Sequence, residues 1–334
     1  MRPTEGGSPD PHGAGSPDPA PRRIADRAKH ASPGRETRRN AGLETRPPWR
    51  VATFVTAAAV LLALWLRLGP LPPLDAASFT SATIVDRNGV VLYEPLSPRG
   101  VRGEWLEAAD LPPNVVDATI AAEDRRFFQH VGLDPLAITR AALHDVRHLR
   151  VVEGGSTITQ QVAKLLLASN NRGLITKARE AIVALRLEHR YSKRELLALY
   201  LNLAPYGNQT AGIVRASRRY FGVAPESLTP AQAAYLASLP QRPGVTRAAT
   251  ARQRVVLARM RALRMLDARA YAEARAERLR FESGAQPLLA PHFVERVRAM
   301  LPNARQRIVT TLDANLQRDV VGIIAAAKGD LRRR

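Results

Sequence analysis

Two stretches of this sequence say most about its fold and its chemistry. Residues 123–132 read EDRRFFQHVG, and residues 154–164 read GGSTITQQVAK. The first places the carboxylate Glu123 close to two guanidinium groups, and the second is a glycine-rich helix start that carries the cation Lys164. A carboxylate can move a proton while nearby cations hold a charged leaving group. Together the two stretches predict a site for an anionic substrate.

The second stretch also predicts how its helix begins. Thr157, with a glutamine three residues later, has the pattern of a capping box. The free N–H groups and the dipole of a helix N-terminus favour a bound anion, although an ordinary capped helix has this pattern more often than a binding site does. Further along, Arg172 and Lys177 add cations, and the spacing places Lys177 and Glu180 on one helix face. That pair alone is equally consistent with a solvated ion pair.

The composition of the chain sets broad limits. With 334 residues it is long enough for one large or two modest domains, and 45% hydrophobic residues can fill a core. The absence of cysteine excludes disulfides and cysteine-ligated metals. The net charge of +20 fits nucleic acid, anionic lipid or a phosphorylated substrate, so charge alone does not identify the partner.

The N-terminal part of the chain predicts a tail and a membrane anchor. We expect residues 1–49 to be a disordered basic tail, because they are rich in proline and glycine and contain no valine or phenylalanine. An apolar run then extends from Val51 to Leu66, with tryptophan and arginine at both ends. This predicts a transmembrane anchor over residues 50–68 rather than a cleaved signal peptide. The basic residues before it predict a cytoplasmic N-terminus, with the rest of the chain outside the cytoplasm.

Beyond the anchor the pattern is mainly α. β-Branched residues around Asn88-Gly89 indicate a β-hairpin, and leucines at helical spacing near 182–201 indicate core-facing helices. A stretch rich in arginine and alanine follows, which we interpret as an exposed helical arm, and Ile308–Leu312 has the pattern of a short strand. The predicted segments are a linker with the hairpin (69–104), the main helical domain (105–245), the arm (246–300) and a C-terminal segment (301–334).

In their order along the chain, these motifs resemble the peptidoglycan glycosyltransferases, which form the lysozyme-like domain of class A penicillin-binding proteins. The resemblance covers residues 80–245 and extends weakly to about 325. Two segments, Leu239–Pro243 and Ala290–Phe293, are most like the 1C branch of that family. The five motifs that carry the resemblance are Glu123-Asp124 with His130 and Gly132; Gly154 to Lys164; Lys177 with Glu180; Tyr200-Leu201-Asn202 with Gly207, Gly212 and Tyr220-Phe221-Gly222; and Leu228-Thr229 with Leu236, Ala237 and Pro240.

The resemblance implies a fold and an activity. The fold would be mainly α: a lysozyme-like glycosyltransferase domain with an N-terminal β-hairpin and a single N-terminal transmembrane helix. The activity would be the polymerisation of lipid II into β-1,4 glycan strands, with inversion and release of undecaprenyl pyrophosphate. The implied partners are lipid II, the growing glycan strand, the membrane and other proteins of cell-wall synthesis, with no nucleic acid. The implied location is the cytoplasmic (inner) membrane of a bacterium, with the catalytic domain on the periplasmic side.

The resemblance also implies roles for individual residues. Glu123 would be the base that takes the proton of the acceptor hydroxyl. Glu180 would be the second catalytic carboxylate, and would either orient the cations or hold a divalent cation, Mg²⁺ or Mn²⁺. The residues expected to bind the substrate and its pyrophosphate are Arg126, Ser156, Thr157, Gln161, Lys164, Arg172, Lys177 and Asn202.

Three positions depart from the pattern of the family. Thr176, Gln232 and Leu165 stand where arginine, glutamate and asparagine are usual, which bears on rate and substrate fit but leaves both candidate carboxylates in place. The sequence also contains no Ser-x-x-Lys and no Lys-Thr-Gly, the nucleophile motifs of the transpeptidase domain that class A proteins carry. Residues 301–334 resemble the link to that domain, so we expect either a part of a longer protein or a naturally shorter one.

Other functions fit parts of the same pattern. A membrane-anchored lytic enzyme with a lysozyme-like fold would need one glutamate, but it would not need Lys164, Arg172 and Glu180 for a pyrophosphate. A non-catalytic scaffold for cell-wall synthesis is compatible with Thr176 and Gln232, yet it gives no reason to keep both glutamates. A nucleic-acid binder fits least well, because the positive charge is scattered along the chain.

Overall fold

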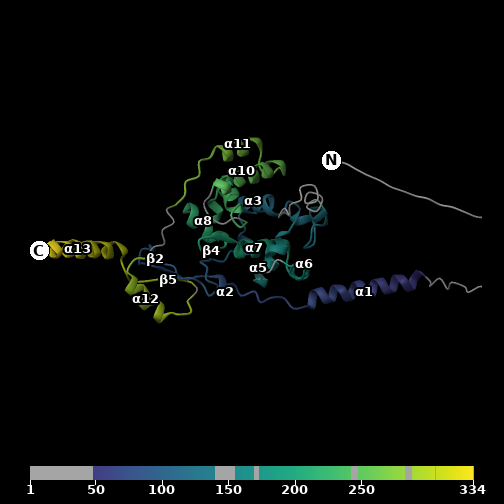
Figure 1. Ribbon diagram of the computed structural model, residues 1–334, viewed down its shortest axis with the longest axis horizontal. Coiled ribbons are helices and arrows are strands. Elements are labelled where there is room, and N and C mark those ends of the chain that lie inside the picture. The colour runs from purple at the N-terminus through teal and green to yellow at the C-terminus, as the bar shows by residue number, and fades with distance from the viewer. Residues whose placement is uncertain are drawn as a thin grey trace, which may run out of the picture. The chain divides into compact units, whose positions relative to one another are not determined.

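The computed structural model describes residues 48–139, 155–168, 173–241, 247–282, 288–304 and 306–333 (Figure 1). Contacts divide the chain into two units, Met1–Ala52 and Thr53–Arg334, and nearly all described residues belong to the second. The predicted disordered tail lies almost wholly outside the described residues. In the described residues helices predominate over short strands, which confirms the mainly α prediction.

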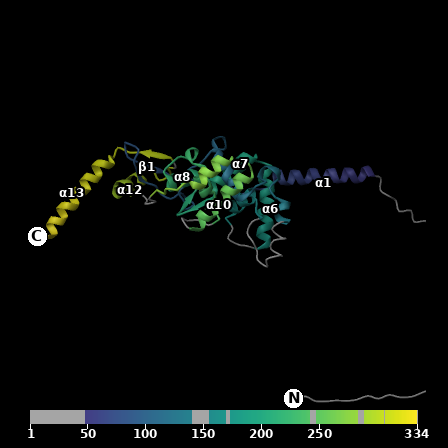
Figure 2. The same cartoon turned by 90° about the horizontal axis from the view of Figure 1, so that it is seen from above.

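The elements follow one another as shown in Figures 1 and 2. The α-helices are α1 (Pro48–Leu68), α2 (Ala76–Phe79), α3 (Pro113–Glu123), α5 (Ile158–Leu167), α6 (Leu174–Glu188), α7 (Lys193–Leu203), α8 (Ile213–Phe221), α9 (Pro230–Ala237), α10 (Arg247–Ala262), α11 (Ala268–Ala276), α12 (Pro291–Met300) and α13 (Ala314–Arg333). The strands are β1 (Thr83–Val85), β2 (Val91–Tyr93), β3 (Pro205–Gly207), β4 (Thr210–Ala211) and β5 (Arg307–Val309).

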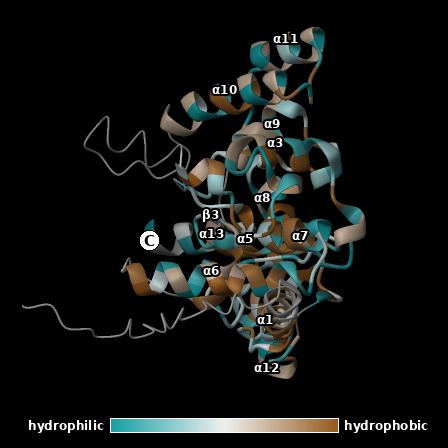
Figure 3. Cartoon of the chain, turned by 90° about the vertical axis from the view of Figure 1, so that its right-hand side faces the viewer, coloured by the Kyte–Doolittle hydropathy of each residue, from teal (hydrophilic) through white to brown (hydrophobic). Residues whose placement is uncertain are grey.

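The hydrophobic core is built around α7. Every residue from Leu196 to Leu203 is buried, so α7 is a central helix and not a surface one. The helix α5 packs on α6 and α7, while α3 packs on α9 and α10. Figure 3 shows the apolar colouring of α7. Burying one large aliphatic side chain of this kind contributes about 1.5–3 kcal/mol to folding.

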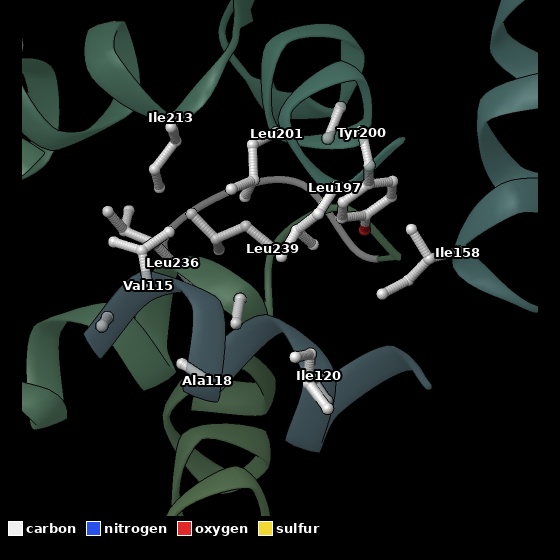
Figure 4. Close-up of a cluster of buried hydrophobic side chains, with 14 of the residues drawn as sticks. Val115, Ala118, Ile120, Ile158, Leu197, Tyr200, Leu201, Ile213, Leu236 and Leu239 are labelled. Carbon is white, nitrogen blue, oxygen red and sulfur yellow. The ribbon is translucent and has the colours of Figure 1, made fainter. Parts of the chain in front are cut away.

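Figure 4 shows how several helices supply one cluster of buried side chains. Tyr200 and Ile158 lie close to the last turns of α3, so the end of that helix is set in the core and not at a free surface. The predicted core-facing leucines near 182–201 are buried or half-buried, but Ile182 is 37% exposed. The labelled side chains are Val115, Ala118, Ile120, Ile158, Leu197, Tyr200, Leu201, Ile213, Leu236 and Leu239.

The prediction of an exposed arm over 246–300 is wrong for its first helix. Ala249, Val256, Leu257 and Met260 of α10 are buried in the same core. The many arginines of this stretch suggested a solvated helix, but its small and apolar residues recur at helical spacing and form a stripe that faces α9 and α3. The main domain therefore continues beyond 245.

The predicted β-hairpin is confirmed. Strand β1 pairs antiparallel with β2 and parallel with β5, so the strand-like run near 308 is also confirmed as part of the same sheet. The turn is longer than the predicted two residues, because the Asp86 carboxylate accepts the backbone N–H groups of Asn88 and Val90, each at 2.8 Å. A second small core lies on this sheet, and it consists of Ile84, Leu92, Val294 and Ala314.

The predicted transmembrane anchor is not borne out as a membrane span. A helix does form, as α1, over residues 48–68. In the described part of the chain, however, no helix combines the length and the apolar character that crossing a membrane requires.

The C-terminal end of α1 is bound to α6 and to the turn that follows α6. The Arg190 side chain donates to the carbonyl of Arg67 at 2.7 Å, and Arg186 donates to the carbonyl of Pro70 at 3.0 Å. The Arg186 guanidinium also lies 4.4 Å from the centre of the Trp65 ring. Cations at a helix C-terminus satisfy its last carbonyls and interact favourably with its dipole, so these two arginines fix the start of the linker.

Candidate active site

Glu123 is the last residue of α3, and the end of that helix is held firmly. The last carbonyls of a helix have no partner within it. Here the Arg259 guanidinium on α10 donates to the carbonyls of Ala121 and Ala122 at 3.3 and 3.0 Å. The backbone that presents Glu123 is therefore fixed by a helix that is distant in sequence.

The two oxygens of the Glu123 carboxylate differ in their hydrogen-bond partners. Gln161 on α5 and Gln241, in the segment after α9, each donate a side-chain N–H to Oε2 at 2.7 Å. The other oxygen, Oε1, is buried and has no hydrogen-bond partner in the described part of the chain. Gln161, which was predicted to bind substrate, thus contacts Glu123 in the structure, and its contact with a substrate stays a prediction.

Two tyrosines lie near this carboxylate. Burial, and then the charge of Glu123, raises the pKa of Tyr200 and of Tyr206 well above the usual range. Both phenols are therefore protonated near neutral pH. The Tyr200 hydroxyl is buried with no hydrogen-bond partner in the described residues, while the Tyr206 carbonyl accepts the hydroxyl of Tyr220 at 2.7 Å.

Asp124 connects residues 123–132 with residues 154–164. Its carboxylate accepts the backbone N–H of Ile158 at 3.1 Å, and His130 Nε2 lies 3.0 Å from the same oxygen. The sequence predicts a bound anion at the N-terminus of α5. In the structure, the carboxylate of Asp124 already binds there. The helix dipole and its free N–H groups favour such a partner.

Thr157 forms the predicted capping box. Its hydroxyl accepts the N–H of Gln160 at 3.1 Å, and the Gln160 side chain accepts the N–H of Thr157 at 3.0 Å. The same hydroxyl donates to the carbonyl of Gly132 at 2.6 Å. Thr157 is only 2% exposed, so its polar atoms serve the fold, and its predicted contact with substrate is untested.

Ser156, Lys177 and Glu180 form one network. Lys177 Nζ donates to Glu180 Oε2 at 2.8 Å and to the Ser156 hydroxyl at 3.2 Å. The predicted placement of Lys177 and Glu180 on one helix face is confirmed. The Glu180 side chain is nearly fully buried and that of Lys177 is half-exposed, so the ammonium group is the part that a ligand can reach.

Glu180 does not fit a divalent cation. Its carboxylate is buried and already neutralised by the ammonium of Lys177, which a metal would have to displace. One other group in the described residues brings three candidate ligand atoms within 4.8 Å: Asp124, His130 and Asp134. Asp124 caps α5, and Asp134 is paired with Arg126, so these acids also have partners. We therefore assign no step of a reaction to Mg²⁺ or Mn²⁺.

Arg126 and Asn202 are engaged within the protein. The Arg126 guanidinium donates to Asp134 at 3.0 Å and to Gln129 at 3.2 Å, and a third of its side chain is exposed. The Asn202 amide both accepts from and donates to the backbone of Leu106, each at 2.8 Å, and Asn202 is buried. Asn202 thus joins α7 to the segment before α3, and its predicted substrate contact stays untested.

The remaining predicted cations are Lys164 and Arg172. Lys164 is exposed, and its spacing from Gln161 places both side chains on one face of the helix. Arg172 lies outside the described residues, so its predicted role stays a prediction. The reachable cations in the described residues around this site thus include Lys164, Lys177 and part of Arg126.

Comparison with known proteins identifies the family of this chain. Residues 89–261 match the family model described as Transglycosylase. The chain belongs to the Transglycosylase family. The match extends past 245 to the end of α10, in agreement with the burial of that helix.

Transglycosylases and penicillin-binding proteins are also found among the relatives. The chain is similar to penicillin-binding protein 1C of Escherichia coli, with 36% identity over 83% of this chain and 37% of that protein. It is similar to penicillin-binding protein 1A of Aquifex aeolicus, with 34% identity over 66% of this chain and 32% of that protein. It is 40% identical to the biosynthetic peptidoglycan transglycosylase of Thiobacillus denitrificans, over 42% of this chain and 60% of that protein. The chain thus spans about a third of the length of these penicillin-binding proteins.

One departure from the family pattern has a structural explanation. At position 232 the resemblance predicts glutamate. The Gln232 side chain accepts the N–H of Thr229 at 3.0 Å, and the Thr229 hydroxyl accepts the N–H of Gln232 at 3.1 Å. Glutamine completes a capping box as glutamate does. The start of α9 is therefore intact in this member of the Transglycosylase family.

Three residues of the site were not predicted from the sequence. Gln241 contacts Glu123, Arg252 donates to the Gln241 side-chain oxygen, and Arg259 holds the end of α3. A signal was present, because Arg252 and Arg259 are seven residues apart and share one face of α10. It was hidden by the many other arginines of this stretch.

Proposed function

We propose that this chain is a peptidoglycan glycosyltransferase that polymerises lipid II into β-1,4 glycan strands. The observation that carries the proposal is the state of Glu123, a carboxylate fixed through one oxygen by two amides, with its other oxygen buried and unpaired. The names of the relatives point the same way, since they include a biosynthetic peptidoglycan transglycosylase and penicillin-binding proteins.

In the proposed reaction Glu123 acts as a general base. The 4-hydroxyl of the acceptor sugar gives its proton to Glu123 while its oxygen forms a bond to the anomeric carbon of the growing strand. The bond from that carbon to the pyrophosphate oxygen breaks, and its electron pair leaves with undecaprenyl pyrophosphate. Attack and departure occur on opposite faces, so an α-linked donor gives a β-linked product.

The departing pyrophosphate needs cations aimed at it. Lys164, on the face of α5 that also carries Gln161, and the half-exposed Lys177 are the described candidates, and Arg172 is proposed with them. Ser156 and Glu180 would then hold the Lys177 ammonium in place. Because the donor carries a lipid, the site would work at a membrane surface, with lipid II and the growing strand as its partners.

A lytic enzyme with one catalytic glutamate is the rival function. It would cleave existing strands, and it would not depend on Lys164 or Lys177. The deciding experiment incubates the purified protein with lipid II, or with isolated sacculi, and separates the products. Glycan strands made from lipid II support the proposal. Soluble fragments released from sacculi, with no strands from lipid II, would contradict it.

A further inference from the structure

Gln241 and Arg252 stand beside the proposed base without belonging to any of the motifs that predict the site. Gln241 donates to Glu123 Oε2 at 2.7 Å. On its other side, the Gln241 side-chain oxygen accepts a hydrogen bond from the Arg252 guanidinium on α10. A chain of two hydrogen bonds thus leads from a cation, through an amide, to one oxygen of Glu123.

We propose that Gln241 and Arg252 are a positioning pair that selects Oε1 of Glu123 as the oxygen that takes the proton. This inference rests on the proposed function, in which Glu123 is the base. The pair is not expected to touch the reacting atoms. It acts by occupying Oε2 and by fixing the rotation of the carboxylate.

The orientation of the Gln241 amide follows from the chemistry of its neighbours. A guanidinium only donates hydrogen bonds and a carboxylate only accepts them. An amide between the two must therefore turn its oxygen to Arg252 and its N–H₂ to Glu123. Arg252 thus prevents the amide from flipping and presenting its oxygen to the base, where it would be repelled.

Both members of the pair have firm supports. Gln241 follows Leu239, which is fully buried, and Ser238, whose hydroxyl donates to the carbonyls of Tyr235 and Ala249 at 2.6 and 3.3 Å. Next to Arg252, the buried Gln253 donates to the carbonyl of Ala231 at 2.9 Å. The helix α10 therefore holds the backbone of the half-buried Arg252 against the core, while Gln241 itself is exposed.

Together with Gln161, Gln241 supplies the hydrogen bonds that Oε2 of Glu123 accepts. Gln161 and Gln241 approach that oxygen from α5 and from the segment after α9, and they use the acceptor sites that a carboxylate oxygen offers. Oε1 is left as the buried acceptor with no partner in the described residues.

Several charged and titratable groups surround Glu123, and they bear on any test by pH. Arg252 and Arg259 face it from α10, Tyr200 from α7 and Tyr206 from β3, and Arg125 follows it in the chain. The tyrosines stay neutral and the arginines stay charged over the working range of pH. In Gln241→Ala the carboxylate of Glu123 therefore remains the group that titrates at this site, and in Gln241→Glu it titrates together with the introduced carboxylate.

The experiment compares Gln241→Ala, Gln241→Glu and Arg252→Met with the wild-type protein, and Arg254→Met serves as the matched control because Arg254 is an exposed arginine on the same helix. We expect Gln241→Ala to lower kcat by roughly tenfold to a hundredfold, the usual effect of losing one hydrogen bond to a charged group. KM and the melting temperature should stay near their wild-type values. Arg252→Met should lower kcat less, because the amide can still donate in one of its two orientations.

The pH dependence separates positioning from a merely structural role. Gln241→Glu puts a second carboxylate beside the base, and like charges disfavour ionisation. The acidic limb of its pH–rate profile should therefore move upward by about one pH unit or more. The proposal is overturned if Gln241→Ala keeps kcat within twofold of the wild type, or if Gln241→Glu leaves the acidic limb where it was.

A direct titration keeps the proposal independent of turnover. Glutamate labelled with ¹³C at the carboxyl carbon gives a signal for Glu123 that is assigned from its loss in Glu123→Gln. That signal should titrate at higher pH in Gln241→Glu than in the wild type, whether or not the protein polymerises lipid II. An unchanged titration would overturn the positioning role, whereas a wild-type protein that makes no strands would instead count against the proposed function.

Discussion

The carboxylate of Asp124 accepts the N–H of Ile158 across 3.1 Å, so residues 34 apart in sequence meet at the first turn of α5. This contact joins the acidic segment after α3 to the capped helix that carries Gln161 and Lys164. The distance from the base to the residues of α5 is therefore set by a bond inside the protein. A substrate anion is not needed to complete this helix start.

Asp124→Ala should destabilise the protein. It removes the partner of a buried N–H and of the His130 ring, so the free energy of unfolding should fall by about 1.5–3 kcal/mol. Thermal unfolding measures this loss, with Asp110→Ala as the control because Asp110 is exposed. An Asp124 variant that keeps its melting temperature but loses turnover would instead mean that this carboxylate acts on the substrate.

Asn202 is expected to matter for stability more than for chemistry. Asn202→Ala breaks both hydrogen bonds to Leu106 and leaves a buried N–H and a buried carbonyl unpaired, which costs about 2–4 kcal/mol if each group contributes the usual amount. Circular dichroism melts should show the loss. Below the melting temperature, lipid II turnover per folded molecule should stay within a few-fold of the wild type. A folded variant with no turnover would restore the predicted substrate contact.

Gln232→Glu should change little, because either side chain closes the capping box with Thr229. We expect an unfolding free energy within about 0.5 kcal/mol of the wild type. Gln232→Ala, which loses one bond of the box, should lose about 0.5–1.5 kcal/mol. Turnover is measured alongside the melts. A gain of several-fold in Gln232→Glu would show that the departure from the family pattern does reduce activity.

The stability of the sheet formed by β1, β2 and β5 should depend on pH through the ionisation of Asp86. Burial opposes ionisation of this carboxyl, but the backbone N–H groups of Ala314, Val90 and Asn88 outweigh it and lower its pKa. A lowered pKa in the folded state adds stability above the unfolded value of 3.8, and that stability is lost as the pH falls through the folded value. The difference in melting temperature between the wild type and Asp86→Asn should be largest near neutral pH. It should shrink towards about pH 3, and a constant difference would contradict this account.

Local patterns in the sequence predicted local structure well. The capping box at Thr157, the ion pair of Lys177 with Glu180 and the hairpin around Gly89 each depend on residues a few positions apart, so spacing alone indicates them. The helical character of the apolar run before Leu68 was likewise indicated by local sequence, and α1 forms there.

Contacts between distant residues could not be predicted in the same way. Gln161 and Gln241 lie 38 and 118 residues from Glu123, and only the packing of α5, α9 and α10 around α3 brings them to it. The sequence of the motif that contains Asn202 is the same whether the Asn202 amide binds a ligand or the backbone of Leu106. The sequence therefore could not distinguish these two roles. The many arginines of α10 led to the prediction of an exposed helix, although its apolar residues form a buried stripe. A charged side chain can lie beside a core position on the same helix turn, so the two patterns overlap in the sequence.

The most direct test of this account is the turnover of lipid II by Glu123→Gln, measured beside the wild type and beside Glu226→Gln as an exposed control. Glutamine can still accept the hydrogen bonds of Gln161 and Gln241, so the variant should fold and melt like the wild type. Without a base, the rate of strand formation should fall by roughly 10²–10⁴. A folded Glu123→Gln protein that forms glycan strands at nearly the wild-type rate would contradict the account.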